Sequence, residues 1–525
     1  MSENSRLTRA AGIVGTATLL SRILGYLRDM VLAGFFGAGP LTDAFITAFR
    51  IPNLLRRMFG EGSLSIAFIP AFTDTLTRKG SDEALRLAGS AFRLLMIVLA
   101  AGVLLGIFFA PWITRLLAYG FVPETEKFAL TLQLTRLMFP YVFFIGLVAL
   151  SMGILNALDH FAAPALAPTL LNVAMISSVA VTAFWTSDPR YRIYGLAVGV
   201  LIGGILQLAL QLPFLIKKGM YVWRSTEWLH PDIRKVLGTF LPATVGAAVF
   251  QINTLVGNLL ASFQGHGGIS YLYYADRLVQ FPLGIFGIST ATAALPSLAR
   301  LAAKDDTVSF RETLAYSINL GLLIMIPAMA GLIVLRKPIV ALLFERGAFG
   351  PEATLMTACA VLYYAVGLWA VSTVRVLVAA FYALQDTRTP VACAGVSIAA
   401  NLILGVLLMN AMGHAGVALA LSLSAMLNVG LLGLALRARL HYLGGRKIVA
   451  STCKIGVSSG IMALVVAEVS RRIIPVQGPE TWDLVLGVLT SILIGLIIYT
   501  LCVYLFKVPE LGRLAAFLKR GPGKR

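Results

Sequence analysis

The chain has 525 residues, of which 58% are hydrophobic and 13% are charged, and its mean hydropathy is +0.85. Soluble domains are less apolar and carry about 25% charged residues, so a soluble enzyme or binding domain is excluded. The composition predicts a polytopic membrane protein of the all-α class. Its frequent Gly and Pro do not argue against helices, because membrane helices tolerate both residues.

Apolar segments long enough to span a bilayer, roughly 20 residues each, follow one another along the chain. We place fourteen of them, at 9–37, 40–78, 88–117, 130–156, 162–185, 192–216, 235–262, 270–300, 312–335, 353–384, 389–411, 413–436, 449–474 and 482–506. The first segment is too long for a cleavable signal and carries Arg22 and Arg28, so we expect it to remain as a helix.

The basic residues are distributed unequally between the two sides of the predicted membrane. With the N-terminus inside, 26 Lys and Arg fall on the cytoplasmic side, nine on the other side and eight within segments. Cytoplasmic loops carry the excess of basic residues, so both termini are predicted to be cytoplasmic. Most of the net charge of +19 is thereby a topology signal, and no nucleic-acid partner is expected.

The second segment is too long for a single crossing. Its 39 residues would rise about 58 Å as one helix, against a hydrocarbon core of roughly 30 Å. We expect a break at the sequence FGEGS, residues 59–63. Glu61 lies at this break and is expected to pair with Arg57 or Arg56.

An internal repeat relates the two halves of the chain. One constant offset in residue number connects Phe36 to Phe263, Arg50 to Arg277, Gly60 to Gly287, Pro111 to Pro338 and Gly120 to Gly347. Segments one to six and seven to twelve are therefore predicted to be two copies in the same orientation, related by an axis along the membrane normal. The predicted parts are two six-helix lobes, 1–220 and 221–445, followed by two extra helices and a basic tail, 446–525.

Arginines recur inside the apolar segments, where a charge costs at least ~2.5–3.5 kcal/mol at mid-bilayer. They include Arg22, Arg28, Arg50, Arg56, Arg57, Arg277 and Arg375. Asp43, Arg50 and Arg57 are seven residues apart, close to one helical stripe. Ser270 and Arg277 share a face with the two tyrosines between them. These faces predict an internal cavity lined with cations, and hence an anionic substrate.

Less specific roles stay open for several of these residues. Arg56 and Arg57 would also suit an interfacial anchor, and Arg375 would also suit a structural pair with Asp276. Asp43 and Asp276 would then only neutralise neighbouring arginines. The four cysteines and five histidines are scattered and predict neither a disulfide framework nor a metal site. No loop exceeds about twenty residues, and no Walker-type glycine loop is present, so catalysis is disfavoured.

Five stretches of the chain resemble the MurJ/MviN family of lipid II flippases. They are SRILGYLRD (21–29), FGAGPLTDAF (36–45), PNLLRRMFGEG (52–62), FAAPALAPTLLN (161–172) and YYADRL (273–278). The resemblance implies membership of the multidrug/oligosaccharidyl-lipid/polysaccharide exporter superfamily, whose two six-helix lobes agree with the repeat. It also implies a groove for the lipid tail formed by the two extra helices, and a location in the bacterial inner membrane.

The resemblance implies that the protein moves lipid II from the cytoplasmic to the periplasmic leaflet. Lipid II is an undecaprenyl-pyrophosphate-linked precursor of peptidoglycan. The substrate-binding residues that the resemblance implies are Arg22, Arg28, Arg56, Ser270 and Arg277, with Asp43, Glu61 and Asp276 as charge partners. Arg50, Arg57 and Arg375 are further candidates. No cofactor is expected; a coupled monovalent cation and association with cell-wall synthesis proteins are left open.

Three alternatives remain beside this interpretation. A related exporter of another lipid-linked oligosaccharide would share the architecture, whereas a drug-cation exporter would need a net acidic cavity. A membrane scaffold that recruits cell-wall enzymes would not need arginines in the bilayer interior. A glycosyltransferase of lipid-linked sugars would need acidic clusters on sizeable loops.

Overall fold

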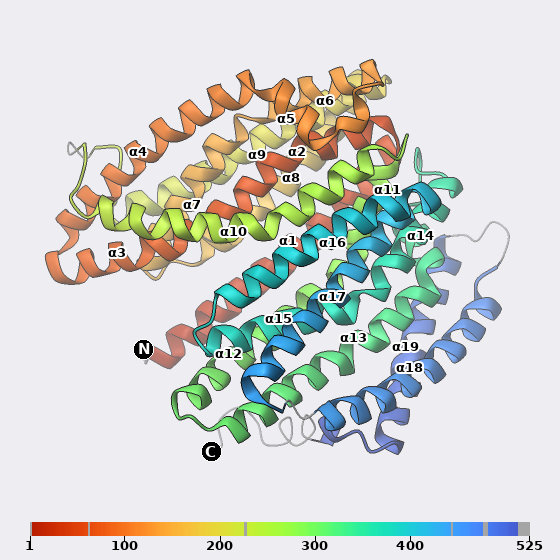
Figure 1. Ribbon diagram of the computed structural model, residues 1–525. Coiled ribbons are helices and arrows are strands. Elements are labelled where there is room, and N and C mark those ends of the chain that lie inside the picture. The colour runs from red at the N-terminus through yellow and green to blue at the C-terminus, as the bar shows by residue number, and fades with distance from the viewer. Residues whose placement is uncertain (1–2, 61–62, 225–227, 443–444, 476–480, 513–525) are drawn as a thin grey trace. The chain divides into compact units, whose positions relative to one another are not determined.

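A computed structural model of the chain describes residues 3–60, 63–224, 228–442, 445–475 and 481–512, without the side chains of 3–11, 59–60, 63, 65–66, 241–243, 245–250 and 288. Within these ranges the regular structure consists of nineteen α-helices, one 3-10 turn and one π-helical turn, with no strand (Figure 1). The predicted all-α class is therefore confirmed.

The helices form two compact units, Met1–Ile269 and Ser270–Arg525. The helices of unit 1 are α1 (Glu3–Phe36), α2 (Pro40–Gly60), α3 (Ser63–Lys79), α4 (Ser81–Phe108), α5 (Ala110–Leu117), η1 (Tyr119–Phe121), α6 (Thr125–Met138), α7 (Tyr141–Ala157), α8 (Ala162–Trp185), α9 (Pro189–Lys217) and α10 (Ile233–Ser262). Those of unit 2 are α11 (Gly268–Pro282), which begins at the boundary, η2 (Leu283–Gly287), α12 (Ile288–Ala303), α13 (Thr307–Phe344), α14 (Pro351–Val366), α15 (Leu368–Ala383), α16 (Arg388–Met412), α17 (His414–Leu440), α18 (Gly445–Ile473) and α19 (Thr481–Leu505).

Eleven helices or consecutive helix pairs in the described ranges are long and apolar enough to cross a membrane. They coincide with eleven of the fourteen predicted segments, so the chain is a polytopic membrane protein. The other three predicted segments contain α1, α2 with α3, and α10. α2 is described up to Gly60 and α3 from Ser63, so the predicted break at residues 59–63 lies partly outside the described residues and stays a prediction. Glu61 lies outside the described residues.

Helix boundaries recur in the two units at an almost constant spacing. The start and the end of α15 follow those of α7 by the same number of residues, to within one position, as Arg277 follows Arg50. The start and the end of α16 follow those of α8 by that offset too. The turn residues Asp159 and Gln385 are related in the same way, and both have left-handed backbones, with φ values of 57° and 59°. These two pairs of helices and the turn between them therefore recur at the spacing found in the sequence.

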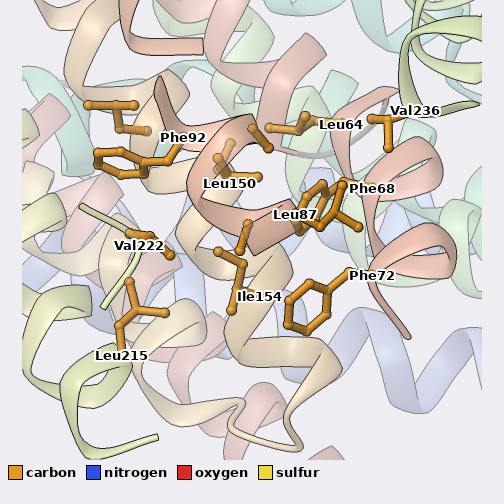
Figure 2. Packing of buried hydrophobic residues seen from close by; sticks show 14 of the residues in the cluster. Leu64, Phe68, Phe72, Leu87, Phe92, Leu150, Ile154, Leu215, Val222 and Val236 are labelled. Atoms are coloured by element: carbon orange, nitrogen blue, oxygen red, sulfur yellow. The ribbon is translucent and has the colours of Figure 1, made fainter. Parts of the chain in front are cut away.

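Each unit has its own apolar core. In unit 1, Phe68 and Phe72 of α3 lie beside Leu87 of α4 and Ile154 of α7 (Figure 2). Large aromatic and aliphatic side chains at helical spacing on these helices form a continuous packed cluster, which fixes the three helices relative to one another. In unit 2 the core joins residues of α12, α13, α15, α17, α18 and α19. The Tyr499 hydroxyl of α19 also donates to a backbone carbonyl of α13, so the two C-terminal helices are attached to α13.

Candidate functional site

Arg28 is held inside unit 1 by two side chains. Its Nε and Nη2 atoms donate to Asp29 Oδ1 at 3.0 and 2.7 Å, and its Nη1 donates to Asn172 Oδ1 of α8 at 3.0 Å. Asn172 in turn donates through Nδ2 to the Ser21 carbonyl of α1 at 3.1 Å. Arg28 is 8% exposed and Asp29 is 1% exposed. Because charge-assisted hydrogen bonds are strong and directional, the guanidinium has a defined position and orientation.

Arg22 lies six residues before Arg28 on α1 and is partly buried. The helix is continuous through Gly25, so the two arginines leave it about 120° apart on an ideal helix. Asp29 is seven residues after Arg22 and lies close to its side of the helix. The first helix therefore presents cations on two of its faces.

Arg56 is a partly buried residue near the end of α2. Its Nε donates to Asn53 Oδ1, one turn earlier, at 3.1 Å. Arg28 and Arg56 therefore come from two different helices of unit 1, and each donates to an asparagine side chain.

Asp43 is a fully buried residue in the first turn of α2. Its Oδ2 atom lies 3.0 Å from Lys127 Nζ of α6 and accepts the backbone N–H of Gly267 at 2.8 Å. Lys127, whose side chain is 3% exposed, also donates to the Gly265 carbonyl at 3.1 Å. The carboxylate and the ammonium therefore neutralise each other and hold the backbone just before α11.

The other two arginines of α2 have different environments. Arg50 donates through Nε and Nη2 to Asn258 Oδ1 of α10 at 3.3 and 3.0 Å. Asn258 donates in turn to the Leu117 carbonyl of α5 at 2.9 Å, so Arg50 belongs to a contact that joins α2, α5 and α10. Arg57 is exposed near the end of α2.

In unit 2, α11 carries Ser270 and Arg277. The Arg277 Nη2 atom donates to the Tyr273 hydroxyl at 2.9 Å, and the guanidinium carbon lies 4.8 Å from the centre of the Tyr273 ring. Ser270 is fully buried, as is Tyr274, whereas Tyr273 and Arg277 are partly exposed. The predicted face is therefore divided: one half packs inside the unit, and the other presents a cation supported by an aromatic ring.

Asp276 and Arg375 do not form the pair that the sequence left open. Asp276 accepts a hydrogen bond from Gln280 on its own helix at 3.3 Å. Arg375 lies on α15 and is partly buried, and no described carboxylate is within ion-pair distance of it. A structural pair between these two residues is therefore absent.

One known protein family matches most of the chain. Residues 32–479 match the family model described as Lipid II flippase MurJ. The match runs from the end of α1 to the region after α18, well beyond half of the sequence.

The chain belongs to this family.

Two relatives in the MurJ family are more than a third identical to the chain over the aligned residues. A probable lipid II flippase MurJ of Vibrio cholerae serotype O1 is 38% identical over 470 residues, which cover 87% of this chain and 88% of the relative. A lipid II flippase MurJ of Burkholderia cenocepacia is 37% identical over 438 residues, covering 82% and 84%.

Solved structures agree with the MurJ assignment. A lipid II flippase MurJ in an inward closed conformation matches with a TM-score of 0.77 and 29% identity, over 94% of this chain and 98% of that one. An inward-facing multidrug resistance transporter of the MATE family matches with a TM-score of 0.67 and 16% identity, over 82% and 98%. The second likeness shows the fold alone.

Three contacts of the site are not predicted by the sequence analysis. The count of basic residues assigns Lys127 to an outer loop, although Lys127, Thr131, Leu134 and Met138 recur at helical spacing and are all buried. That spacing is a usable signal for a buried face. Asn172 and Asn258 contact Arg28 and Arg50 from 144 and 208 residues away. No local sequence pattern predicts such distant partners.

Proposed function

We propose that the protein moves lipid II from the cytoplasmic to the periplasmic leaflet of the bacterial inner membrane. Membership of the MurJ family over most of the chain supports this substrate. The observation that carries the proposal is Arg28, a nearly buried cation of a polytopic membrane protein that two side chains hold in place. Such a cation requires a function, and the planar, permanently charged guanidinium suits a pyrophosphate.

For the architecture we propose fourteen membrane crossings with both termini in the cytoplasm. Two lobes in the same orientation, 1–220 and 221–445, form the transport unit, and α18 with α19 provides a groove for the lipid tail. The recurring helix boundaries and the unequal distribution of Lys and Arg support this arrangement. In unit 1, α10 packs against α3, so the first helix of the proposed second lobe contacts a helix of the first.

For the mechanism we propose alternating access around one cationic cavity. Arg22, Arg28 and Arg56 contribute from the first lobe, and Ser270 and Arg277 from the second. The pyrophosphate oxygens replace some of the acceptors that now hold these guanidinium groups, and Asp29 and Asp276 lower the electrostatic cost of the empty cavity. Binding and release suffice, because moving the cargo breaks no covalent bond, and the protein is a transporter and not an enzyme.

For the energy source we propose the membrane potential, with no bound cofactor. The cargo carries about two negative charges to the positive side, and each charge gains roughly 2.3 kcal/mol per 100 mV. A coupled monovalent cation is the alternative source. An imposed ion gradient at zero potential distinguishes the two.

The experiment that tests the function is a leaflet assay in cells. Depletion of the protein from cells that have no other flippase should make lipid II accumulate in the cytoplasmic leaflet, out of reach of a periplasmic reagent. Re-expression should restore access. Accumulation of a different lipid-linked oligosaccharide with normal lipid II access would favour the related-exporter alternative, and normal access for every such lipid would contradict transport.

A further inference from the structure

Glu510 is a buried carboxylate just beyond the last membrane-spanning helix. It is 5% exposed and follows the end of α19 at Leu505. Its Oε1 atom accepts a hydrogen bond from Asn319 Nδ2 of α13 at 2.8 Å, and its Oε2 atom accepts one from Ser451 Oγ of α18 at 2.7 Å. Asn319 and Ser451 are each 4% exposed. One carboxylate therefore joins α13 to α18 at a place almost closed to water.

The chain turns back after α19 and brings Glu510 to this place. Lys507 has a left-handed backbone, with a φ of 48°. Its N–H donates to the Tyr504 carbonyl at 3.1 Å. The N–H of Val508 donates to the Val503 carbonyl, also at 3.1 Å. These two hydrogen bonds form a Schellman motif, which ends many helices. Val508 then packs into the apolar core of unit 2, so the turn directs the following residues inward.

α13 receives the C-terminal helices through two polar contacts on one face. The Tyr499 hydroxyl of α19 donates to the Leu323 carbonyl, and Asn319 donates to Glu510. Asn319 and Leu323 are four residues apart, so they lie on the same side of α13. Hydrogen bonds to a charged group are shorter and stronger than those between neutral groups. The Glu510 contact is therefore the stronger of the two, and it is the one that also holds α18.

We infer that Glu510 positions α18 for binding the lipid tail of the cargo, without touching the cargo itself. This inference rests on the proposed function, in which α18 and α19 provide the groove for the tail. Asn319 and Ser451 lie towards the cytoplasmic ends of their predicted segments, 312–335 and 449–474. In the proposed topology, the contact thus lies where a tail enters from the cytoplasmic leaflet.

The physical reason for this role is preorganisation. Helices that are already fixed lose less conformational freedom when a ligand orders them, and the affinity is correspondingly higher. A long tail contacts more of the groove than a short one does. Glu510 should therefore raise the affinity for a long polyprenyl chain and leave the binding of the pyrophosphate, which the arginines of the proposed cavity provide, unchanged.

The test separates the tail from the headgroup with two probes. Undecaprenyl pyrophosphate and farnesyl pyrophosphate carry the same headgroup on isoprenoid chains of different length. Native mass spectrometry of the purified full-length chain in detergent gives the dissociation constants. Glu510→Ala removes both hydrogen bonds, so it should raise the dissociation constant for undecaprenyl pyrophosphate about tenfold. The dissociation constant for farnesyl pyrophosphate should not change.

Two milder variants of the contact keep the test independent of a folding defect. In Glu510→Gln the new amide can accept from Ser451 and, once the Asn319 amide turns over, donate to Asn319 Oδ1. That oxygen has no hydrogen-bond partner in the described part of the chain. Glu510→Gln should therefore recover part of the lost affinity. Ser451→Ala removes only the contact with α18, and should weaken binding of undecaprenyl pyrophosphate alone.

The matched control is an exposed ion pair between the same two helices. Glu312 of α13 lies 3.3 Å from Lys447 of α18, and their side chains are 67% and 75% exposed. Solvent and salt screen such a pair, so Glu312→Gln should bind both probes as the wild type does. A second control, Arg136→Gln, removes an exposed charge at the end of α6 in unit 1 and should also leave both affinities unchanged.

The possible failures are distinct. If Glu510→Ala binds undecaprenyl pyrophosphate with wild-type affinity, or loses affinity for both probes equally, the inference is overturned. If the wild type itself binds neither probe, the proposed function fails. If the wild type binds both probes equally well, the proposed tail groove fails, and the role of Glu510 fails with it.

A second measurement tests the position of α18 without a ligand. Spin labels are attached to Val308→Cys of α13 and Leu464→Cys of α18, both at exposed positions, in a chain whose four native cysteines are replaced by serine. The distances between the labels should be narrowly distributed in the otherwise unchanged chain and in Glu312→Gln, and broadly distributed in Glu510→Ala. A distribution that stays narrow in Glu510→Ala would contradict the positioning role.

Discussion

The Lys127 ammonium lies 3.0 Å from the Asp43 carboxylate, and the exposed fractions of the two side chains are 3% and 0%. The pair joins α6 to the first turn of α2. Both partners also bind the backbone of the link before α11, through Gly265 and Gly267. The link from which Ser270 and Arg277 follow is therefore fixed by two opposite charges that water does not reach.

Removing one partner of this pair should strongly destabilise the protein. Lys127→Met leaves the Asp43 carboxylate buried without its cation, and such a change costs about 3–5 kcal/mol. The double variant Asp43→Asn with Lys127→Met should recover part of that loss, because the fully buried carboxylate is neutralised together with its cation. Thermal unfolding is measured in detergent for the wild type, both single variants and the double variant. The four stabilities give the coupling free energy between the two residues.

The matched control for that cycle is an exposed ion pair that joins α6 to α9. Arg190 lies 2.8 Å from Glu126 of α6, with side chains 69% and 84% exposed. Solvent and salt screen such a pair, so removing it should change stability by less than about 1 kcal/mol. Equal losses from the buried and the exposed pair would show that the Lys127–Asp43 contact is not formed as described.

Asn172 should act on transport through Arg28. Asn172→Ala removes the acceptor of Arg28 Nη1 and the contact from Asn172 to the Ser21 carbonyl. A hydrogen bond to a charged group contributes about 1.5–3 kcal/mol, so affinity for undecaprenyl pyrophosphate should fall tenfold or more. Asn410→Ala, at an exposed position of α16, is the control. Unchanged affinity in Asn172→Ala would remove the positioning role.

Acid stability should depend on Asp232, which precedes α10. Hydrogen bonds from Lys79 and then Lys235 hold the pKa of Asp232 at about 2, below its ordinary 3.8. A lowered carboxyl pKa stabilises the fold above pH 4, and this contribution is lost as the pH falls from about 4 towards 2. The same hydrogen bond raises the pKa of Lys79 above 10.5. On the alkaline side, the pair should therefore persist until Lys79 loses its proton at very high pH.

The measurement compares the melting temperatures of the wild type and Asp232→Asn between pH 3 and pH 7. The difference between them should shrink as the pH falls. Asp306 and Asp386 also have lowered pKa values, from hydrogen bonds with Ser309 and Thr389, and they affect both proteins alike. The role of Asp232 is therefore read from the difference in melting temperature between the two proteins, not from either melting temperature alone. A difference that is constant across the range would contradict the assigned role of Asp232.

Transport should respond to the membrane potential and not to ATP. Two charges moving through 100 mV gain about 4–5 kcal/mol, which biases an equilibrium by about three orders of magnitude. In vesicles with a clamped potential, collapsing the potential should stop net movement of lipid II, and removing ATP should not. Sustained accumulation at zero potential without any ion gradient would exclude this energy source.

The sequence is sufficient for the fold class and the repeat because both depend on patterns spread along the chain. Long apolar segments of membrane-spanning length fix the helices, and the offset between Arg50 and Arg277 reappears in the helix boundaries. These properties add up over many residues, so local exceptions do not obscure them.

The individual contacts are less accessible from the sequence. Lys127 resembles a loop residue when charge alone is considered, and only its helical spacing indicates a buried position. The contact between Arg28 and Asn172 depends on how α1 packs against α8, which no local pattern encodes. Arg375 shows the opposite case, since its position amid valines is visible in the sequence but the absence of a pair with Asp276 required the structure.

The most direct test of the account is a flipping assay with the arginines of the two units. Purified protein is reconstituted into vesicles with an imposed potential and lipid II in one leaflet, and its appearance in the other is measured. The account predicts rapid movement for the wild type and for Arg136→Gln, and loss of movement for Arg28→Gln and for Arg277→Gln, each still folded by its melting curve. Wild-type rates in both site variants would contradict it.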